Sequence, residues 1–192
     1  MTTHESKFQA LEAEAIASLR RPHEIGAVAS ADRPSLALLI WEFPAFEPYR
    51  SWALLQRGDA AAPTYLVRRT TWDRPTDYRR AYDPLRQASF LMDPRPAPTV
   101  EAVDVRLAAD AAERIAGSAA RLAIPAFEAD RAVTLDGRTS GVSTRRRTAG
   151  IEWNGDGPPA WLAFTTEVGA LRAALEAAAS AGDAVRRRLV TP

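Results

Sequence analysis

The chain has 192 residues, of which 46% are hydrophobic and 26% charged, so it can bury a substantial core without disulfide or metal support. It contains no cysteine, which excludes disulfides, thiolate catalysis and every zinc or iron–sulfur site built on cysteine. The 25 basic and 24 acidic residues nearly cancel, so no global field attracts a nucleic acid, and we expect no nucleic-acid partner.

Other features of the composition narrow the class further. The two histidines, His4 and His23, both lie near the N-terminus, so we predict no histidine-based metal centre, no Ser-His-Asp triad and no cofactor. The first 19 residues lack the basic segment and apolar core of a signal peptide, and no apolar run approaches the ~18 residues of a membrane span. We expect a cytoplasmic protein with no membrane contact, and we attribute its arginine and alanine bias to a GC-rich bacterial genome.

The N-terminal part of the chain predicts one helix followed by three strands. Apolar residues recur at steps of three and four over residues 7–19, which indicates an amphipathic helix within residues 3–20. Residues 35–43, 51–57 and 64–72 have strand patterns separated by short loops, as in an antiparallel meander. Because the first of these strands is apolar on both alternating faces, we expect it to be covered on both sides.

The middle of the chain combines helices with a further strand. A helix is predicted from Pro75 to about residue 88, and the internal Pro84 limits or kinks it. Residues 92–99 contain three prolines and predict a linker. Residues 100–107 then predict a strand, and residues 109–124 predict a helix that the following proline ends.

The C-terminal third begins with strands. One strand ends in Asp136-Gly137, a residue pair that favours a type I′ hairpin turn because both central residues need positive φ. Residues 139–147 and 150–153 predict paired strands.

A last helix is expected after a broad turn over residues 154–159. Thr165 or Thr166 is a candidate N-cap for it, and it ends near Gly182. The tail, residues 183–192, is expected to be frayed or loosely docked. All these elements predict a single α+β domain over residues 1–192, with a mostly antiparallel sheet of about six or seven strands and three or four flanking helices.

Three consecutive arginines at positions 145–147 form a candidate site. In a strand, Arg145 and Arg147 share one face and Arg146 points to the other, so the three do not form one cluster. The alternatives are a solvated sheet face, a contact with a protein partner, and a nucleic-acid contact, in that order of preference. Arg145 and Arg147 are therefore candidate partner-binding residues.

Tryptophans provide a second kind of candidate. Trp41 and Trp52 fall in apolar strands and are expected in the core, and the phase of Trp153 with Ile151 favours burial. Trp161 follows the turn GDGPP and either clamps the last helix or, if exposed, is a partner-binding residue, because tryptophan is enriched among interface hot spots.

The segment WDRPTDYRR, residues 72–80, is dense in acids, bases and aromatics. A glycosidase-like hydrolase would need two carboxylates, here Asp73 and Asp77, to converge across a cleft. Both residues also suit the start of a helix, where a carboxylate satisfies orphan amides, and we favour that explanation. No phosphate-binding loop or nucleophile elbow occurs, so no catalytic residue is predicted.

The landmarks VRRTTWDRPTDY, LAIP, LDGRTSGV, IEW and GPPAW occur in this order between residues 66 and 179. They resemble a loose group of uncharacterised small bacterial proteins with a W-D-R…D-Y segment, an I-P pair, an L-D-G hairpin and a closing Trp-Gly-Pro-Trp pattern. Where those proteins commonly have a large residue after L-D-G, this chain has Thr139-Ser140-Gly141. The resemblance implies a small partner-binding or immunity-like protein and carries over no active site. We expect a non-enzymatic protein-binding protein, with a hydrolase as the alternative.

Overall fold

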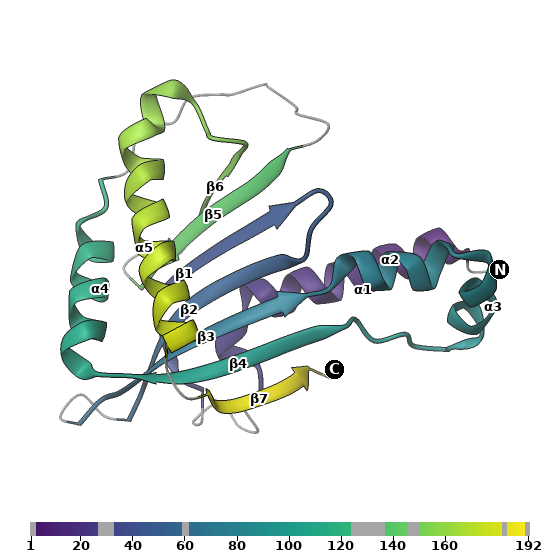
Figure 1. Cartoon of the computed structure of the whole chain (residues 1–192), viewed down its shortest axis with the longest axis horizontal. Coiled ribbons are helices and arrows are strands. Elements are labelled where there is room, and N and C mark those ends of the chain that lie inside the picture. The colour runs from purple at the N-terminus through teal and green to yellow at the C-terminus, as the bar shows by residue number, and fades with distance from the viewer. Residues whose placement is uncertain are drawn as a thin grey trace.

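Figure 1 shows the computed structural model of the chain, which describes residues 3–26, 33–58, 62–123, 137–145, 150–181 and the backbone of 184–190. Within these ranges the helices are α1 (His4–Arg20), α2 (Arg74–Tyr82), α3 (Pro84–Met92), α4 (Ala109–Arg121) and α5 (Leu162–Ala181). The strands are β1 (Ser35–Pro44), β2 (Tyr49–Arg57), β3 (Thr64–Trp72), β4 (Val100–Leu107), β5 (Arg138–Thr144), β6 (Ile151–Asn154) and β7 (Ala184–Val190). Short 3-10 turns, η1 (Pro22–Glu24) and η3 (Pro159–Trp161), follow α1 and precede α5.

The seven described strands form one sheet in the order β6-β5-β1-β2-β3-β4-β7, and every neighbouring pair is antiparallel. The predicted α+β class with six or seven antiparallel strands is confirmed. Five α-helices are described where three or four were predicted, because Pro84 ends the helix that begins after Asp73 and starts a new one.

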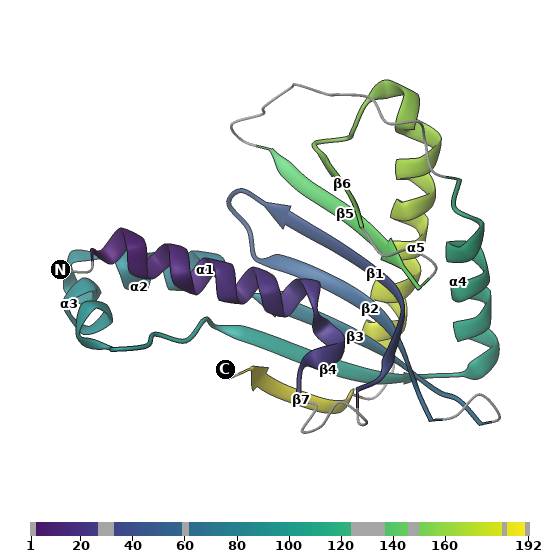
Figure 2. The same ribbon diagram turned by 180° about the vertical axis from the view of Figure 1, so that it is seen from behind.

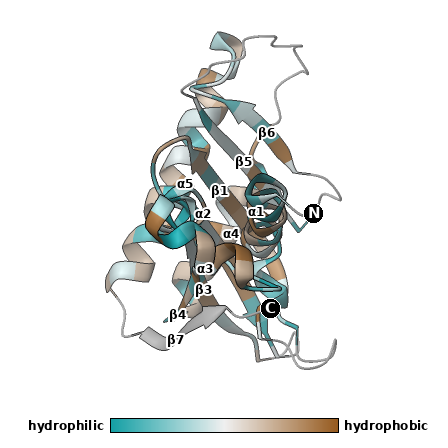
Figure 3. Cartoon of the chain, turned by 90° about the vertical axis from the view of Figure 1, so that its right-hand side faces the viewer, coloured by the Kyte–Doolittle hydropathy of each residue, from teal (hydrophilic) through white to brown (hydrophobic). Residues whose placement is uncertain are grey.

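Helices cover both faces of the sheet. In Figures 1 and 2, α4 and α5 lie on one face and α1 on the other, and Figure 3 shows the sheet between α5 and α1. Alternate residues of β1 enter the two cores: Leu38 and Ile40 pack with α4 and α5, whereas Leu39 and Trp41 pack with α1. This division explains why β1 is apolar at nearly every position, as the sequence predicted.

A helical arm extends from one end of this layered body. We define it as residues 4–12 of α1 together with α2 and α3. Figures 1 and 2 show that α1 crosses the sheet and continues beyond it beside α2, and that α3 forms the tip. The arm therefore presents surface well away from the sheet.

A buried ion pair connects the sheet to the turn after α1. Arg68 of β3 is fully buried, and its guanidinium donates to both carboxylate oxygens of Asp104 on β4, with Nε–Oδ1 2.5 Å and Nη2–Oδ2 2.7 Å. Its Nη1 also donates to the carbonyl oxygens of Pro22 and, at 3.1 Å, of Ile25. One guanidinium therefore joins two strands to η1.

Close packing fixes the register of β1 and β5. Gly141 lies directly opposite Trp41, and a Cβ added to Gly141 would come within 2.1 Å of the Trp41 ring. The indole Nε1 of Trp41 donates to Glu152 at 3.2 Å, and the guanidinium of Arg20 lies over the ring at 5.7 Å. Glycine is required here for steric reasons, since any side chain would displace the indole.

On the opposite face, Glu176 ties α5 to the sheet. Its carboxylate accepts hydrogen bonds from the indole Nε1 of Trp52 and, at 2.9 Å, from Nη1 of Arg69. Burial opposes ionisation of Glu176, but these hydrogen bonds and the positive charge of Arg69 outweigh it and lower the pKa of the carboxyl.

The C-terminal segments differ from the sequence predictions in two places. Residues 184–190 form β7 along the edge of β4, whereas a frayed or loosely docked tail was predicted. The strand forms because its backbone pairs with the free edge of β4, a segment far away in the sequence. Helix α5 begins at Leu162, so Thr165 and Thr166 lie within its first turns, where both hydroxyls donate to the Leu162 carbonyl instead of capping the helix.

Two predictions lie partly outside the described residues. The first is the hairpin turn at Asp136-Gly137, of which Asp136 and the strand before it are not described. The second is the arginine triplet, of which Arg146 and Arg147 are not described. None of the helices in the described ranges has the length and apolar character needed to cross a membrane.

Candidate functional site: the helical arm

The arm folds because short polar side chains start each of its helices. Asp73 is the N-cap of α2, where its carboxylate accepts hydrogen bonds from the backbone N of Thr76 at 3.1 Å and from the Thr76 hydroxyl at 2.8 Å. Asp83 caps α3 in the same way, accepting from the backbone N of Leu85 at 2.9 Å, with Pro84 at the first helical position. The prediction that Asp73 marks a helix start is confirmed.

Asp77 was also predicted to favour a helix start, but its carboxylate has a different role. It is fully buried, and its carboxylate accepts hydrogen bonds from Trp72 Nε1 at 2.7 Å and from Arg80 Nη1 at 2.6 Å. It also accepts from the backbone N and the hydroxyl of Thr99, at 2.7 and 2.9 Å. Asp77 thus joins the end of β3, the arm and the segment before β4, and no accessible pair of carboxylates forms with Asp73.

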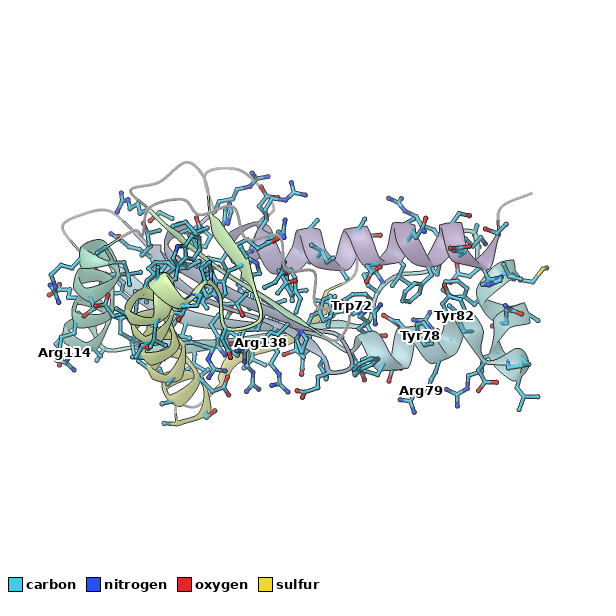
Figure 4. The ribbon with its side chains drawn as sticks, turned by 90° about the horizontal axis from the view of Figure 1, so that it is seen from above. Trp72, Tyr78, Arg79, Tyr82, Arg114 and Arg138 are labelled. Atoms are coloured by element: carbon cyan, nitrogen blue, oxygen red, sulfur yellow. The ribbon has the colours of Figure 1, made fainter. Side chains whose placement is uncertain are left out.

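Aromatic rings hold α1 and α2 together. Tyr78 and Tyr82 stack with their ring centroids 4.4 Å apart, and Phe8 meets both edge-on at 5.7 and 5.5 Å. Figure 4 shows both tyrosines pointing from α2 toward α1. The guanidinium of Arg74 lies within 6.0 Å of the ring centroids of Phe8, Tyr49 and Tyr78 and pairs with Glu12 at 3.0 Å. These contacts make the arm a packed unit rather than an isolated helix.

The tip is fastened by Lys7. Its Nζ donates to the carbonyl oxygens of Leu91 at 2.6 Å and Asp93 at 2.7 Å, at the C-terminus of α3. An ammonium at this position satisfies carbonyl groups that have no partner within the helix and interacts favourably with the helix dipole. The orientation of α3 is therefore set by the body of the arm.

The outer surface of the arm is unusually apolar. Six large hydrophobic residues are exposed among those described, and five of them lie on the arm or on the β1–β2 loop beside its base: Phe46, Tyr78, Leu85, Leu91 and Met92. That loop contacts the arm through the hydrogen bond from Arg74 Nη1 to the Ala45 carbonyl at 3.3 Å. Exposed apolar residues scattered singly need no explanation, whereas several gathered on one element form a candidate interaction surface.

On α3 these residues form one stripe. Leu85, Ala88 and Met92 are spaced by three and four residues and therefore share one helix face, with Leu85 93% and Met92 84% exposed. The opposite face buries Phe90 against the arm. Helix α3 is consequently apolar on two faces, only one of which is covered by the described part of the chain.

Three exposed arginines, Arg79, Arg86 and Arg95, lie on α2, on α3 and just after α3. None of them forms an ion pair with a carboxylate of the described ranges. Within the described ranges Arg79 donates to the Pro75 carbonyl and the Thr76 hydroxyl, and Figure 4 shows it pointing away from α1. The nearby Asp83 and Asp93 accept from backbone amides. The tip therefore combines apolar side chains with arginines that form no ion pair in the described ranges, while Asp83 and Asp93 carry negative charge beside them.

The partner-binding residues predicted from sequence lie elsewhere. Arg145 is exposed at the end of β5, where its Nη1 donates to Gln56 at 3.3 Å and its backbone N to Ala37 at 3.1 Å, close to the start of β1 and away from the arm. Arg147 is outside the described ranges. Trp161 is only 6% exposed and packs edge-on to Phe164 at 6.1 Å, so it clamps α5 to the core and is not available to a partner.

Sequence reasoning missed the arm as a surface. The signal was present in PLRQASFLM, whose apolar residues fall on two opposite faces of a helix, although one face suffices to bury so short an element.

The other chemical possibilities find little support in the described ranges. No group of three histidine, aspartate or glutamate residues there could hold a metal ion. A groove of about 480 Å³ lies between α4 and α5, and nothing in the structure shows what occupies it. Comparison with protein-family models, curated proteins and solved structures finds no match.

Proposed function

We propose that the chain is a non-enzymatic protein-binding protein that docks through the tip of its helical arm. The observation that carries this proposal is that three exposed hydrophobic residues, Leu85, Leu91 and Met92, lie on the projecting arm together with arginines that form no ion pair in the described ranges. The alternative of a hydrolase has less support, because both of its candidate acids have structural roles. Asp73 caps a helix, and Asp77 is a buried hydrogen-bond acceptor.

The chemistry of the arm defines the partner. An amphipathic helix presenting residues at steps of three and four suits an apolar groove, as in other helix-in-groove complexes. The arginines of the arm favour an acidic rim around that groove, because opposite charges speed association and suppress wrong partners.

Immunity-like neutralisation is the form of binding that the sequence resemblance implies. In that case the partner is a toxin, and its acidic groove would be blocked when α3 is inserted. Co-expression of the chain with a toxin encoded beside its gene tests this version of the proposal.

Site-specific photocrosslinking tests the surface itself. A benzophenone side chain placed at position 85 should give a discrete protein adduct in the native host, whereas the same group at Leu162, which is 69% exposed on α5, should not. Once the adduct is identified, Leu85→Asp with Met92→Asp should weaken the purified complex by about 30-fold or more, as expected for hot-spot residues. Arg86→Glu should also weaken it and reduce its salt dependence.

The double aspartate variant provides its own folding control. Both side chains are almost fully exposed, so its melting temperature should match that of the wild type. Equal adducts at positions 85 and 162, or an affinity unaffected by the double substitution, would refute the proposal. An adduct to lipid rather than protein would refute the choice of partner class.

A further inference from the structure

A second cavity, of about 280 Å³, lies on the α5 face of the sheet, between β1, β5, β6 and the first turns of α5. Its apolar wall includes Ile40, Trp153 and Val168, all buried. The volume is just below that of sites for drug-sized ligands, so the cavity suits a smaller molecule. Its lining residues belong neither to the arm nor to the α4–α5 groove.

Two ion pairs line this cavity. Arg172 of α5 pairs with Glu42 of β1 at 3.1 Å and stacks on Trp52 with its guanidinium 5.8 Å from the ring centroid. Arg138 of β5 pairs with Asp156 at 3.4 Å, a long contact in which the Asp156 side chain is 98% exposed. The second pair is therefore weak, and Arg138 can exchange its partner at little cost.

Ser140 adds a hydroxyl group to the cavity wall. Ser140 is 5% exposed, lines the cavity and lies directly opposite Glu42 in the β1–β5 register. Its hydroxyl makes no hydrogen bond to any residue in the described part of the chain. The hydroxyl borders the cavity and is therefore available to a bound ligand.

The helix wall is open at Gly169. This glycine lies in the interior of α5, where glycine is a poor helix former, and a Cβ added to it would meet no atom within 4 Å. The residue lines the cavity, so its missing side chain contributes directly to the space.

The balance of charges selects the ligand. A simple anion would be attracted by Arg138 and Arg172 but repelled by Glu42 and Asp156, and a simple cation would meet the reverse. A ligand with both charges satisfies both signs. We propose that this cavity binds a small zwitterion with an apolar side chain, namely a free aliphatic α-amino acid, with its carboxylate on Arg138, its ammonium on Glu42 and Ser140, and its side chain against Ile40 and Val168.

Titration of the full-length protein with L-leucine, followed by NMR and calorimetry, tests the proposal. We expect saturable binding with perturbed amides at Ile40, Ser140 and Gly169. Leucinamide lacks the carboxylate and N-acetyl-leucine lacks the ammonium. Each should bind at least about tenfold more weakly than L-leucine, because each loses one charge-assisted contact.

Matched variants locate the site. Arg138→Gln should weaken L-leucine binding about tenfold, whereas Arg114→Gln, which alters an exposed arginine on the distant α4 (Figure 4), should not. Gly169→Met should abolish binding by filling the cavity, and because its Cβ meets no neighbour it should keep or raise the melting temperature. The variant Leu85→Asp should bind L-leucine normally, which separates this site from the arm.

Three results would overturn the proposal. These are the absence of saturable binding up to about 20 mM L-leucine, well beyond a millimolar dissociation constant; equal affinity for leucinamide or N-acetyl-leucine; and undiminished binding by Gly169→Met. The first would show that the cavity does not take this ligand, the second would contradict the charge argument, and the third would place the ligand elsewhere.

Discussion

Removal of the Asp104 carboxylate should be among the most damaging single changes to the fold. In Asp104→Ala, the guanidinium of Arg68 stays fully buried and keeps only the carbonyl oxygens of Pro22 and Ile25 as acceptors. Breaking a buried ion pair from one side costs about 3–5 kcal/mol, because the remaining charge is uncompensated. Domains are stable by only about 5–15 kcal/mol, so the variant should lose a large part of its free energy of unfolding.

A double variant distinguishes the penalty of an unpaired charge from the value of the pair. Arg68→Met with Asp104→Leu replaces both ions by apolar side chains, and removing both partners is often nearly neutral. The two carbonyl oxygens then lose the hydrogen bonds from Arg68, at a cost of at most about 1–3 kcal/mol each. We therefore expect the double variant to lose less stability than the sum of Arg68→Met and Asp104→Leu made singly, which is a departure from additivity.

Urea denaturation followed by far-UV circular dichroism measures these differences, provided that the slope of free energy against urea stays the same. Arg114→Ala is the control, since Arg114 and Asp110 are each 71% exposed and their pair should contribute almost nothing. A loss below about 1 kcal/mol for Asp104→Ala would refute the reasoning, because another group must then neutralise the guanidinium.

Three further results are expected. Gly141→Ala should cost about 1–3 kcal/mol and alter tryptophan fluorescence, since the new Cβ overlaps the Trp41 ring; an unchanged melting temperature would contradict this packing. The stability gap between wild type and Glu176→Gln should be full above pH 4.5 and shrink as the pH falls through the lowered folded-state pKa, and a gap that grows on acidification would be the wrong sign. Asp77→Asn should cost about 1–3 kcal/mol and speed hydrogen exchange in α2, whereas exchange unchanged at Arg80 would show that the arm does not depend on this carboxylate.

The elements that sequence predicted best are those with a strong local pattern. Strands β3 and β4 were predicted with the same ends that the structure shows, because turn residues flank alternating apolar ones. The double coverage of β1 followed from its apolar character on both faces. Helix α1 agrees to within a few residues at each end.

The rest depends on contacts between distant segments. Strand β7 exists through its pairing with β4, and its three consecutive arginines, 186–188, resemble a solvated tail when read alone. The burial of Trp161 follows from how α5 packs, whereas the glycines and prolines before it indicate only a turn. Asp73 and Asp77 look alike in sequence, yet one caps a helix and the other is enclosed by Trp72 and Thr99, which only the tertiary fold brings together.

The two ends of the sheet also bear on how the protein behaves at high concentration. An open sheet presents unpaired backbone groups along its outer strands, which can recruit strands of other molecules into aggregates. Here one outer strand, β6, has only four residues, and the other outer strand is β7. Strand β4, which is longer than β7, is therefore an inner strand of the sheet. Removal of residues 184–190 would expose the edge of β4, so we expect it to increase self-association at high concentration.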